Sequence, residues 1–193
     1  NDHYGIPRRQ YANSANRVTA LDEDKFARVT DQYVRMSLEL QREFGLRREE
    51  AIKIRLVLAD KGDILWLKPS WTKGGRTREI PIRTEAQREV LDRARALAGK
   101  GSLIPAEKNY KEQKNRYEGQ CIRAGLCKMH GLRHAYAQRR FEEIAGFAAP
   151  LAGGPKRADL TNDQRALDKK ARAVITKELG HNRERITVTY LGR

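Results

Sequence analysis

Three histidines and one tyrosine near the end of the chain form the pattern that most directly suggests chemistry. His130, His134 and His181 each lie close to an arginine in the sequence, and Tyr190 follows His181 by nine positions. A phenol with an ordinary pKa of about 10 can attack phosphorus if a neighbouring group accepts its proton. We assign that acceptor role to His130, and the attack would leave a covalent phosphotyrosine at Tyr190.

Transfer of a phosphodiester also requires positive hydrogen-bond donors and an acid for the leaving sugar oxygen. Arg47 and Arg133 are our candidates for the donors, because the planar fork of a guanidinium pairs with two phosphate oxygens. Lys73 stands before Gly74-Gly75 at an expected hairpin tip, where it could protonate the leaving 5′-oxygen. His181 would bind a nonbridging oxygen.

Each of these residues also has an ordinary structural explanation. A single arginine among 40 Lys and Arg residues is usually solvated, and a Lys-Gly-Gly run is usually only a turn. His130 and His134 have the spacing of zinc ligands, but the residues between them lack the glutamate of a metallohydrolase. We therefore expect His134 to support helix packing, and we expect neither a metal nor another cofactor.

The elements that must position these residues are mostly helices. Apolar residues at helical spacing predict a continuous helix over 22–44 and a shorter helix from Leu46 through Ile52. Capping patterns at Thr84 and Thr161 predict helices that run to Gly99 and to about Leu179. Two further helices are expected at about 107–124, with Tyr117, Cys121 and Ile122 in its stripe, and at about 131–144. The stripe of the last helix includes Leu167.

A small antiparallel sheet is expected between the second and third of these helices. Residues 64–70 and 77–82 favour strands, and Gly74-Gly75 between them is typical of a hairpin turn. The fold class is therefore mainly α with a small antiparallel β-sheet. Residues 1–20 lack apolar periodicity and are interpreted as an arm or the remnant of a linker, and residues 21–193 as one domain. The run 146–160 is rich in Gly, Pro and Ala and is expected to be a loop.

Composition indicates the kind of partner. The 40 Lys and Arg residues against 25 Asp and Glu give a formal charge of +15 over 193 residues, which favours a polyanion. The longest uncharged stretch falls short of the ~20 apolar residues that span a bilayer. Cys121 and Cys127 are the only cysteines, and we interpret them as reduced packing thiols, which predicts a cytosolic compartment.

Five short motifs resemble those of the tyrosine recombinases, or phage-type integrases, and occur in the order of that family. They cover about residues 45–193 and are Gly45–Glu50, Thr72–Gly75, His130–His134, Leu179–His181 and Tyr190. The resemblance implies that the catalytic domain of this family is present. It also implies a catalytic set, matched position by position, of Arg47, Lys73, His130, Arg133, His181 and Tyr190, with Glu50 and His134 in supporting positions.

The resemblance further implies a function and partners. The expected function is site-specific, metal-independent cleavage and rejoining of double-stranded DNA in the bacterial cytoplasm, as in an integrase of a mobile element. The family's N-terminal core-binding domain is expected to be missing from this chain. A homotetramer on DNA and an accessory DNA-bending protein are further expected partners.

Two departures and two rivals accompany this interpretation. His181 follows His130 by 51 positions, an interval longer than is usual in the family, and the surplus falls in the loop-rich insertion at about 146–160 and the start of the next helix. Three residues follow Tyr190, whereas family members commonly have a longer tail. The rivals are a non-catalytic basic DNA-binding module, in which the cations only contact phosphate, and strand cleavage of the type IB topoisomerase kind.

Overall fold

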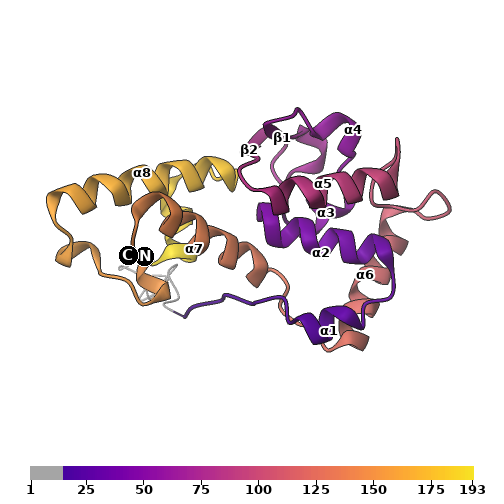
Figure 1. Cartoon of the computed structure of the whole chain (residues 1–193), viewed down its shortest axis with the longest axis horizontal. Coiled ribbons are helices and arrows are strands. Elements are labelled where there is room, and N and C mark those ends of the chain that lie inside the picture. The colour runs from indigo at the N-terminus through magenta and orange to yellow at the C-terminus, as the bar shows by residue number, and fades with distance from the viewer. Residues whose placement is uncertain (1–14) are drawn as a thin grey trace, which may run out of the picture.

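The computed structural model describes residues 15–193, and most of these lie in helices. Figure 1 shows α7 and α8 extending together to one side and the sheet, α4, α5 and α6 on the other. The helices and strands are α1 (Glu23–Ala27), α2 (Gln32–Phe44), α3 (Arg48–Lys53), α4 (Leu56–Ala59), β1 (Ile64–Leu67), β2 (Arg78–Pro81), α5 (Glu85–Ala98), α6 (Tyr110–Ala124), α7 (Gly131–Ala145), α8 (Asn162–Glu178) and α9 (Glu184–Leu191). The described residues also include the short 3-10 helices η2 (Pro69–Trp71), η3 (Pro150–Ala152) and η4 (Arg157–Asp159).

The expected antiparallel sheet is confirmed, and it has two strands. β1 and β2 pair with Trp66 opposite Glu79 and Leu65 opposite Ile80. Their connection contains η2 and the Gly74-Gly75 turn, which leaves Lys73 exposed between the strands. The fold class predicted from the sequence is therefore correct.

The single helix expected over 22–44 is wrong, because the chain forms two helices there. Asp31 begins α2 as its N-cap and accepts a hydrogen bond from the Val34 backbone nitrogen at 3.1 Å. The preceding Thr30 donates its backbone N–H to the side chain of Gln120 on α6 at 3.1 Å. A cap and a tertiary contact thus replace helical bonds at the break.

The caps expected at Thr84 and Thr161 are confirmed. Each side-chain oxygen accepts from the backbone nitrogen three residues later, Gln87 or Gln164. At Thr161 the Gln164 side chain also accepts from the Thr161 backbone, which completes the capping box. These caps fix the starts of α5 and α8.

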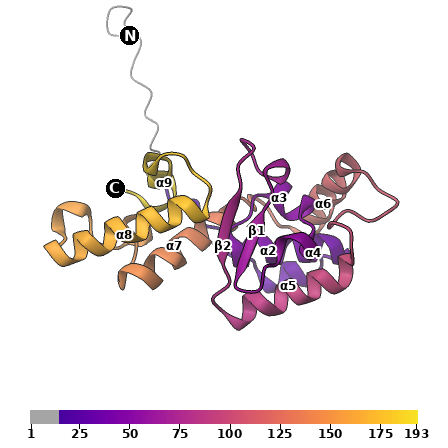
Figure 2. The same cartoon turned by 90° about the horizontal axis from the view of Figure 1, so that it is seen from above.

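Helix α2 separates two apolar clusters. One face, with Met36, Leu40 and Phe44, joins residues of the sheet, α5, α7, α8 and α9 in the larger cluster. The other face, with Val34 and Leu38, packs in a cluster with residues of α1, α3 and α6. In Figure 2, α9 lies beside α8, and the sheet stands between this pair and α6.

Three side chains depart from the burial expected of them. Ile122 is exposed, because Tyr117, Cys121 and Ala124 make the buried side of α6. Leu167 is also exposed, since the ion pair of Asp168 and Arg172 occupies the buried side of α8 there. Cys121 is buried as expected, but Cys127 is exposed and is therefore not a packing thiol.

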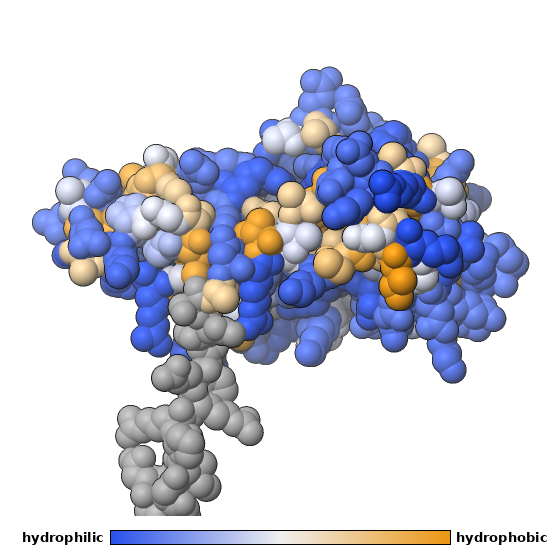
Figure 3. Space-filling view, turned by 90° about the horizontal axis from the view of Figure 1, so that it is seen from below, coloured by the Kyte–Doolittle hydropathy of each residue, from blue (hydrophilic) through white to orange (hydrophobic). Residues whose placement is uncertain are grey.

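The surface is largely polar, as expected from the many charged residues in the sequence. Figure 3 shows one face that is mostly hydrophilic, with small, separated hydrophobic patches. Within residues 15–193, the helices are too short or too polar to cross a membrane. The expected loop over 146–160 is present and contains η3 and η4.

Candidate active site

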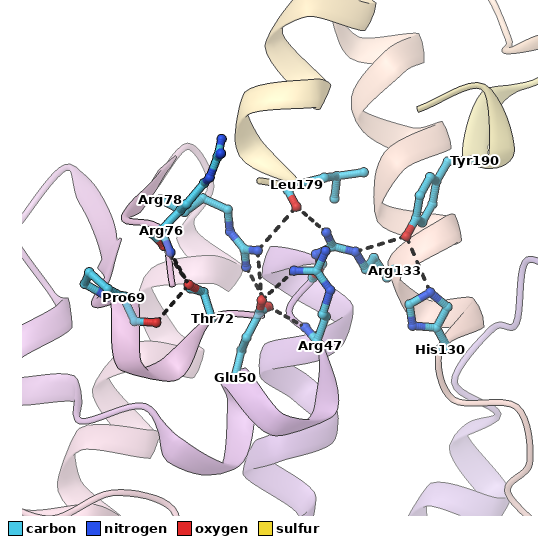
Figure 4. A network of polar contacts seen from close by, with 11 residues as sticks. Arg47, Glu50, Pro69, Thr72, Arg76, Arg78, His130, Arg133, Leu179 and Tyr190 are labelled. Atoms are coloured by element: carbon cyan, nitrogen blue, oxygen red, sulfur yellow. Dashed lines mark hydrogen bonds and ion pairs between the residues drawn. The ribbon is translucent and has the colours of Figure 1, made fainter. Parts of the chain in front are cut away.

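The predicted site residues come from five separate elements. Figure 4 shows Arg47, His130, Arg133 and Tyr190 in one region, His181 packs near Tyr190, and Lys73 lines one cavity with Arg47 and His130. Arg47 lies at the start of α3 and Lys73 in the β1–β2 connection. His130 and Arg133 lie at the start of α7, His181 in the turn after α8, and Tyr190 on α9.

Glu50 holds two arginines at the centre of this region. Its carboxylate accepts from the backbone nitrogen and Nη1 of Arg47, each at 2.7 Å. The same carboxylate accepts two bonds from Arg78, from Nη1 at 3.0 Å and Nη2 at 2.7 Å. The supporting position predicted for Glu50 is thus occupied by a buried side chain that orients Arg47.

The pKa of Glu50 reflects these neighbours. Burial alone would raise it, but the charge and hydrogen bonds of Arg78, with the charges of Arg133 and Arg47, lower the pKa to about 2. The carboxylate is therefore ionised at neutral pH. One negative charge among three arginines leaves this region positive and suited to an anion.

Arg133 is buried and fixed by the backbone. Nη1 donates to the carbonyl oxygen of Gly45 and Nη2 to that of Leu179, so the side chain ties the end of α2 to the end of α8. Burial, followed by the charges of Arg78 and Arg47, lowers the pKa of Arg133 to about 10. The guanidinium remains charged at neutral pH.

Tyr190 presents its hydroxyl to two of the predicted site residues. Tyr190 Oη lies 3.4 Å from Arg133 Nε and 3.5 Å from His130 Nε2. The side chain is 7 % exposed, and Figure 4 shows the hydroxyl directed between these two partners. A phosphorus atom next to this oxygen would therefore lie beside a cation and within reach of a proton acceptor.

The histidines around Tyr190 are held in the neutral form. Burial, then the charge of Arg133, lowers the pKa of His130 and that of His181, the latter to about 3. A neutral His130 can accept a proton at Nε2. His181 contacts Thr187 Oγ1 through Nδ1 at 3.1 Å, which leaves its other ring nitrogen free of this contact.

His134 packs against the nucleophile candidate as a supporting residue. Its ring centroid lies 4.3 Å from that of Tyr190, with an interplanar angle of 30°. Burial, then the charge of His130, lowers the pKa of His134 to about 4. Within residues 15–193, the His, Cys, Asp and Glu side chains form no group of three that could hold a metal.

A cavity of about 630 Å³ adjoins this cluster. Arg47, Lys73 and His130 line it together with residues of α6. Three of the predicted catalytic residues thus face one space that a substrate could enter. Lys73 is exposed in its wall, while Arg133 and Tyr190 are buried and are not among the residues that line it.

Two contributors were missed from the sequence. Arg78 lies in a strand pattern that gives no reason to expect a buried cation, yet it is 4 % exposed and pairs with Glu50. Thr187 orients His181, and Tyr190 lies on a helix, α9, that the sequence did not predict. No sequence motif around Arg78 indicates that it pairs with Glu50, and no motif around Thr187 indicates that it orients His181.

Tyr136 is the other tyrosine in this part of the chain that could compete as a nucleophile. It is fully buried and donates its hydroxyl hydrogen bond to Glu178 at 2.7 Å. Burial, followed by the charge of Glu178, raises the pKa of Tyr136. These contacts disfavour Tyr136 as the attacking group.

Comparison with known proteins assigns the family. The family model described as "Integrase" matches residues 9–139, which is more than half of the chain. The chain therefore belongs to the integrase family, the tyrosine recombinases. The match ends before His181 and Tyr190. No curated protein matches the chain.

Solved structures share this fold at low sequence identity. A lambda integrase dimer bound to a COC′ core site is 18 % identical, with a TM-score of 0.53, and the match covers 88 % of this chain and 60 % of that chain. The post-cleavage complex of the XerH site-specific recombinase with a palindromic difH substrate is 16 % identical, with a TM-score of 0.54. This match covers 94 % of this chain and 51 % of that chain. The chain thus spans between half and two thirds of these neighbours.

Proposed function

We propose that this chain is the catalytic part of a site-specific DNA recombinase that cuts and rejoins DNA through Tyr190. The observation that supports this most strongly is the position of Tyr190 Oη, 3.4 Å from Arg133 Nε and 3.5 Å from His130 Nε2. Family membership and the charge of +15 support DNA as the substrate. Residues 21–193 form this catalytic domain.

In the proposed cleavage step, Tyr190 Oη forms a bond to the scissile phosphorus and the bond from phosphorus to the 5′-oxygen breaks. The phenol proton passes to Nε2 of the neutral His130. Lys73, exposed in the cavity wall, protonates the leaving 5′-oxygen. The product is a 3′-phosphotyrosine, and the reverse transfers rejoin the strand.

The nonbridging oxygens are bound by Arg47, Arg133 and His181. Glu50 orients Arg47 through two hydrogen bonds, and the backbone carbonyls of Gly45 and Leu179 fix Arg133 before substrate arrives. Such preorganised donors stabilise the charge that develops on the phosphorane. These side chains supply the charge stabilisation for which other enzymes use a metal, so the step is proposed to be metal-independent.

The proposal extends to the assembly. A homotetramer on duplex DNA, with an accessory DNA-bending protein, would bring two cleaved duplexes together for strand exchange. The same site serves integration and excision, because both reactions use the same cleavage and rejoining steps.

The test is incubation with a nicked duplex whose short 5′-product strand diffuses away after cleavage. We expect an SDS-stable, DNase-resistant adduct that also forms in EDTA and is absent in Tyr190→Phe. Tyr33→Phe, a tyrosine change on α2 outside this site, is the matched control and should form the adduct normally. DNA binding without any adduct would favour the non-catalytic module instead.

A further inference from the structure

Three segments far apart in the sequence meet at the end of α9, next to the residue proposed to attack DNA. They are the segment before α1, represented by Asn16, the centre of α7 at Gln138, and η3 in the loop-rich insertion. None of them supplies a residue of the proposed catalytic set. They are nevertheless linked by hydrogen bonds to one another, and Gln138 Nε2 also donates to the backbone carbonyl oxygen of Tyr190.

Asn16 uses both ends of its side-chain amide. Nδ2 donates to the carbonyl oxygen of Leu151 in η3 at 2.9 Å. Oδ1 accepts from Gln138 Nε2 at 3.0 Å and from the backbone nitrogen of Val18 at 3.2 Å. A carboxamide can donate to one partner and accept from the others, whereas a carboxylate of the same size could only accept. Asn16 therefore joins the entering segment, the insertion and α7.

Gln138 connects this junction to the nucleophile. Its side chain is buried, and Nε2 donates to the carbonyl oxygen of Tyr190 at 3.0 Å as well as to Asn16. The two hydrogens of one amide group thus serve the entering segment and the residue that carries the reactive hydroxyl.

The insertion also packs directly on the end of α9. Gly192, with a φ of 85°, closes the helix so tightly on η3 that an added Cβ would lie 3.1 Å from Leu151 Cγ and from Pro150 Cβ. The entering segment lies closer still to the start of α7, since a Cβ on Gly131 would lie 2.6 Å from the carbonyl oxygen of Arg17. At Gly192 the neighbours are side-chain atoms of Leu151 and Pro150 together with the Leu151 backbone nitrogen, so there is no room for a side chain between α9 and η3.

We propose that Gln138 is a positioning residue for Tyr190, and that the segment at Asn16 and the insertion at Leu151 act on the nucleophile through it. The inference rests on the proposed function of Tyr190. In this proposal, the insertion at 146–160 supports the end of α9 in the same chain. The segment that enters the domain is thereby coupled to the reactive hydroxyl.

A second contact holds the same helix without involving the entering segment. Arg172, paired with Asp168 on α8, donates from Nη1 to the carbonyl oxygen of Gly192 at 2.8 Å. Loss of Gln138 therefore loosens α9 while the Arg172 contact keeps it on the domain. The expected defect is one of position, with the fold and the DNA-binding surface retained.

The first experiment measures adduct formation in a single turnover at saturating nicked DNA, together with the affinity for DNA. We expect Gln138→Leu to slow the step about fivefold to tenfold, as for the loss of one buried hydrogen bond, with the dissociation constant within about twofold of wild type. Gln120→Leu is the matched control, since Gln120 is a buried amide on α6 that bonds Thr30. It should leave the rate unchanged.

Asn16→Asp tests the coupling on an exposed residue whose change leaves the core intact. It keeps the acceptor and removes the donor to Leu151, so we expect a smaller slowing of about threefold. The double variant should be no slower than Gln138→Leu alone, because Asn16 acts through Gln138. Independent, multiplying effects of the two changes would overturn the coupling, and a normal rate in Gln138→Leu would overturn the positioning role.

The second experiment is amide hydrogen exchange of the full chain without DNA, so it does not depend on catalysis. In Gln138→Leu and Asn16→Asp we expect faster exchange across residues 186–193 and unchanged exchange in α6. In Gln120→Leu we expect faster exchange in α6 and unchanged exchange across residues 186–193. Unchanged exchange at 186–193 in both variants would overturn the inference. If the wild type forms no adduct but exchange at 186–193 is faster in both variants, the proposed function is wrong. The structural role of Gln138 and Asn16 in holding α9 is then still supported.

Discussion

Glu50→Gln is expected to destabilise the domain by several kcal/mol, although Glu50 is proposed to touch no substrate. The change removes the negative charge that faces Arg47 and Arg78, and Arg78 is 4 % exposed. Loss of one partner of a buried ion pair costs about 3–5 kcal/mol. For a chain of this size, each kcal/mol lowers Tm by about 2–4 °C. We therefore expect Tm to fall by about 6–20 °C.

Acidification provides a second measure of the same interaction. The pKa of Glu50 is about 2 in the folded chain, against an ordinary value of 4.5. Because the folded pKa is lowered, this stabilisation is fully present above pH 4.5 and is lost as the pH falls towards 2. At 1.36 kcal/mol per pKa unit, the loss is about 3 kcal/mol, similar to that expected from Glu50→Gln.

The assay is thermal and denaturant unfolding of wild type and Glu50→Gln between pH 7 and pH 3. Glu23→Gln is the control, since Glu23 pairs with Arg42 at the surface with its side chain 73 % exposed, and should change little. The part of the acid destabilisation that comes from Glu50 should disappear in Glu50→Gln. Equal Tm values for the two variants at pH 7 would refute the assignment of Glu50 as the centre of the arginine cluster.

Three further predictions concern the chemistry. Arg133→Lys should keep a charge but lose the fork, and should slow adduct formation by about two to three orders of magnitude with little change in DNA affinity; rates within twofold of wild type would count against the clamp. Replacement of the scissile 5′-oxygen by sulfur should rescue Lys73→Ala but not Arg133→Ala, and rescue of neither would reduce Lys73 to a DNA contact. Because the pKa of His130 is lowered from 6.5, wild-type cleavage should decline only below pH 6.5, as His130 becomes protonated. The pH profile of His130→Ala should lack this decline, and an unchanged profile would exclude His130 as the proton acceptor.

Much of the fold could be predicted from local sequence. The caps at Thr84 and Thr161 and the Gly74-Gly75 turn act through nearby backbone groups, so their residue types suffice. The break between α1 and α2 could not be predicted in this way. It depends partly on a contact from Thr30 to Gln120, which lies 90 positions further along the chain.

The candidate site shows the same division. Arg47, Arg133 and Tyr190 can be identified from their side-chain chemistry and from motifs that resemble those of a family, and the structure brings them together. Arg78 was missed because its burial depends on Glu50, 28 positions away. The junction of Asn16 and Gln138 spans 122 positions and two amides of ordinary type, so no short pattern could reveal it.

The identity of the residue that becomes attached to DNA tests the central claim most directly. Trypsin should release residues 186–193, in which Tyr190 is the only tyrosine, separately from residues 134–139, which contain Tyr136. Mass spectrometry of the DNase-treated adduct should place the nucleotide phosphate on Tyr190 within residues 186–193. A nucleotide on residues 134–139, or an adduct that persists at wild-type level in Tyr190→Phe, would contradict the account.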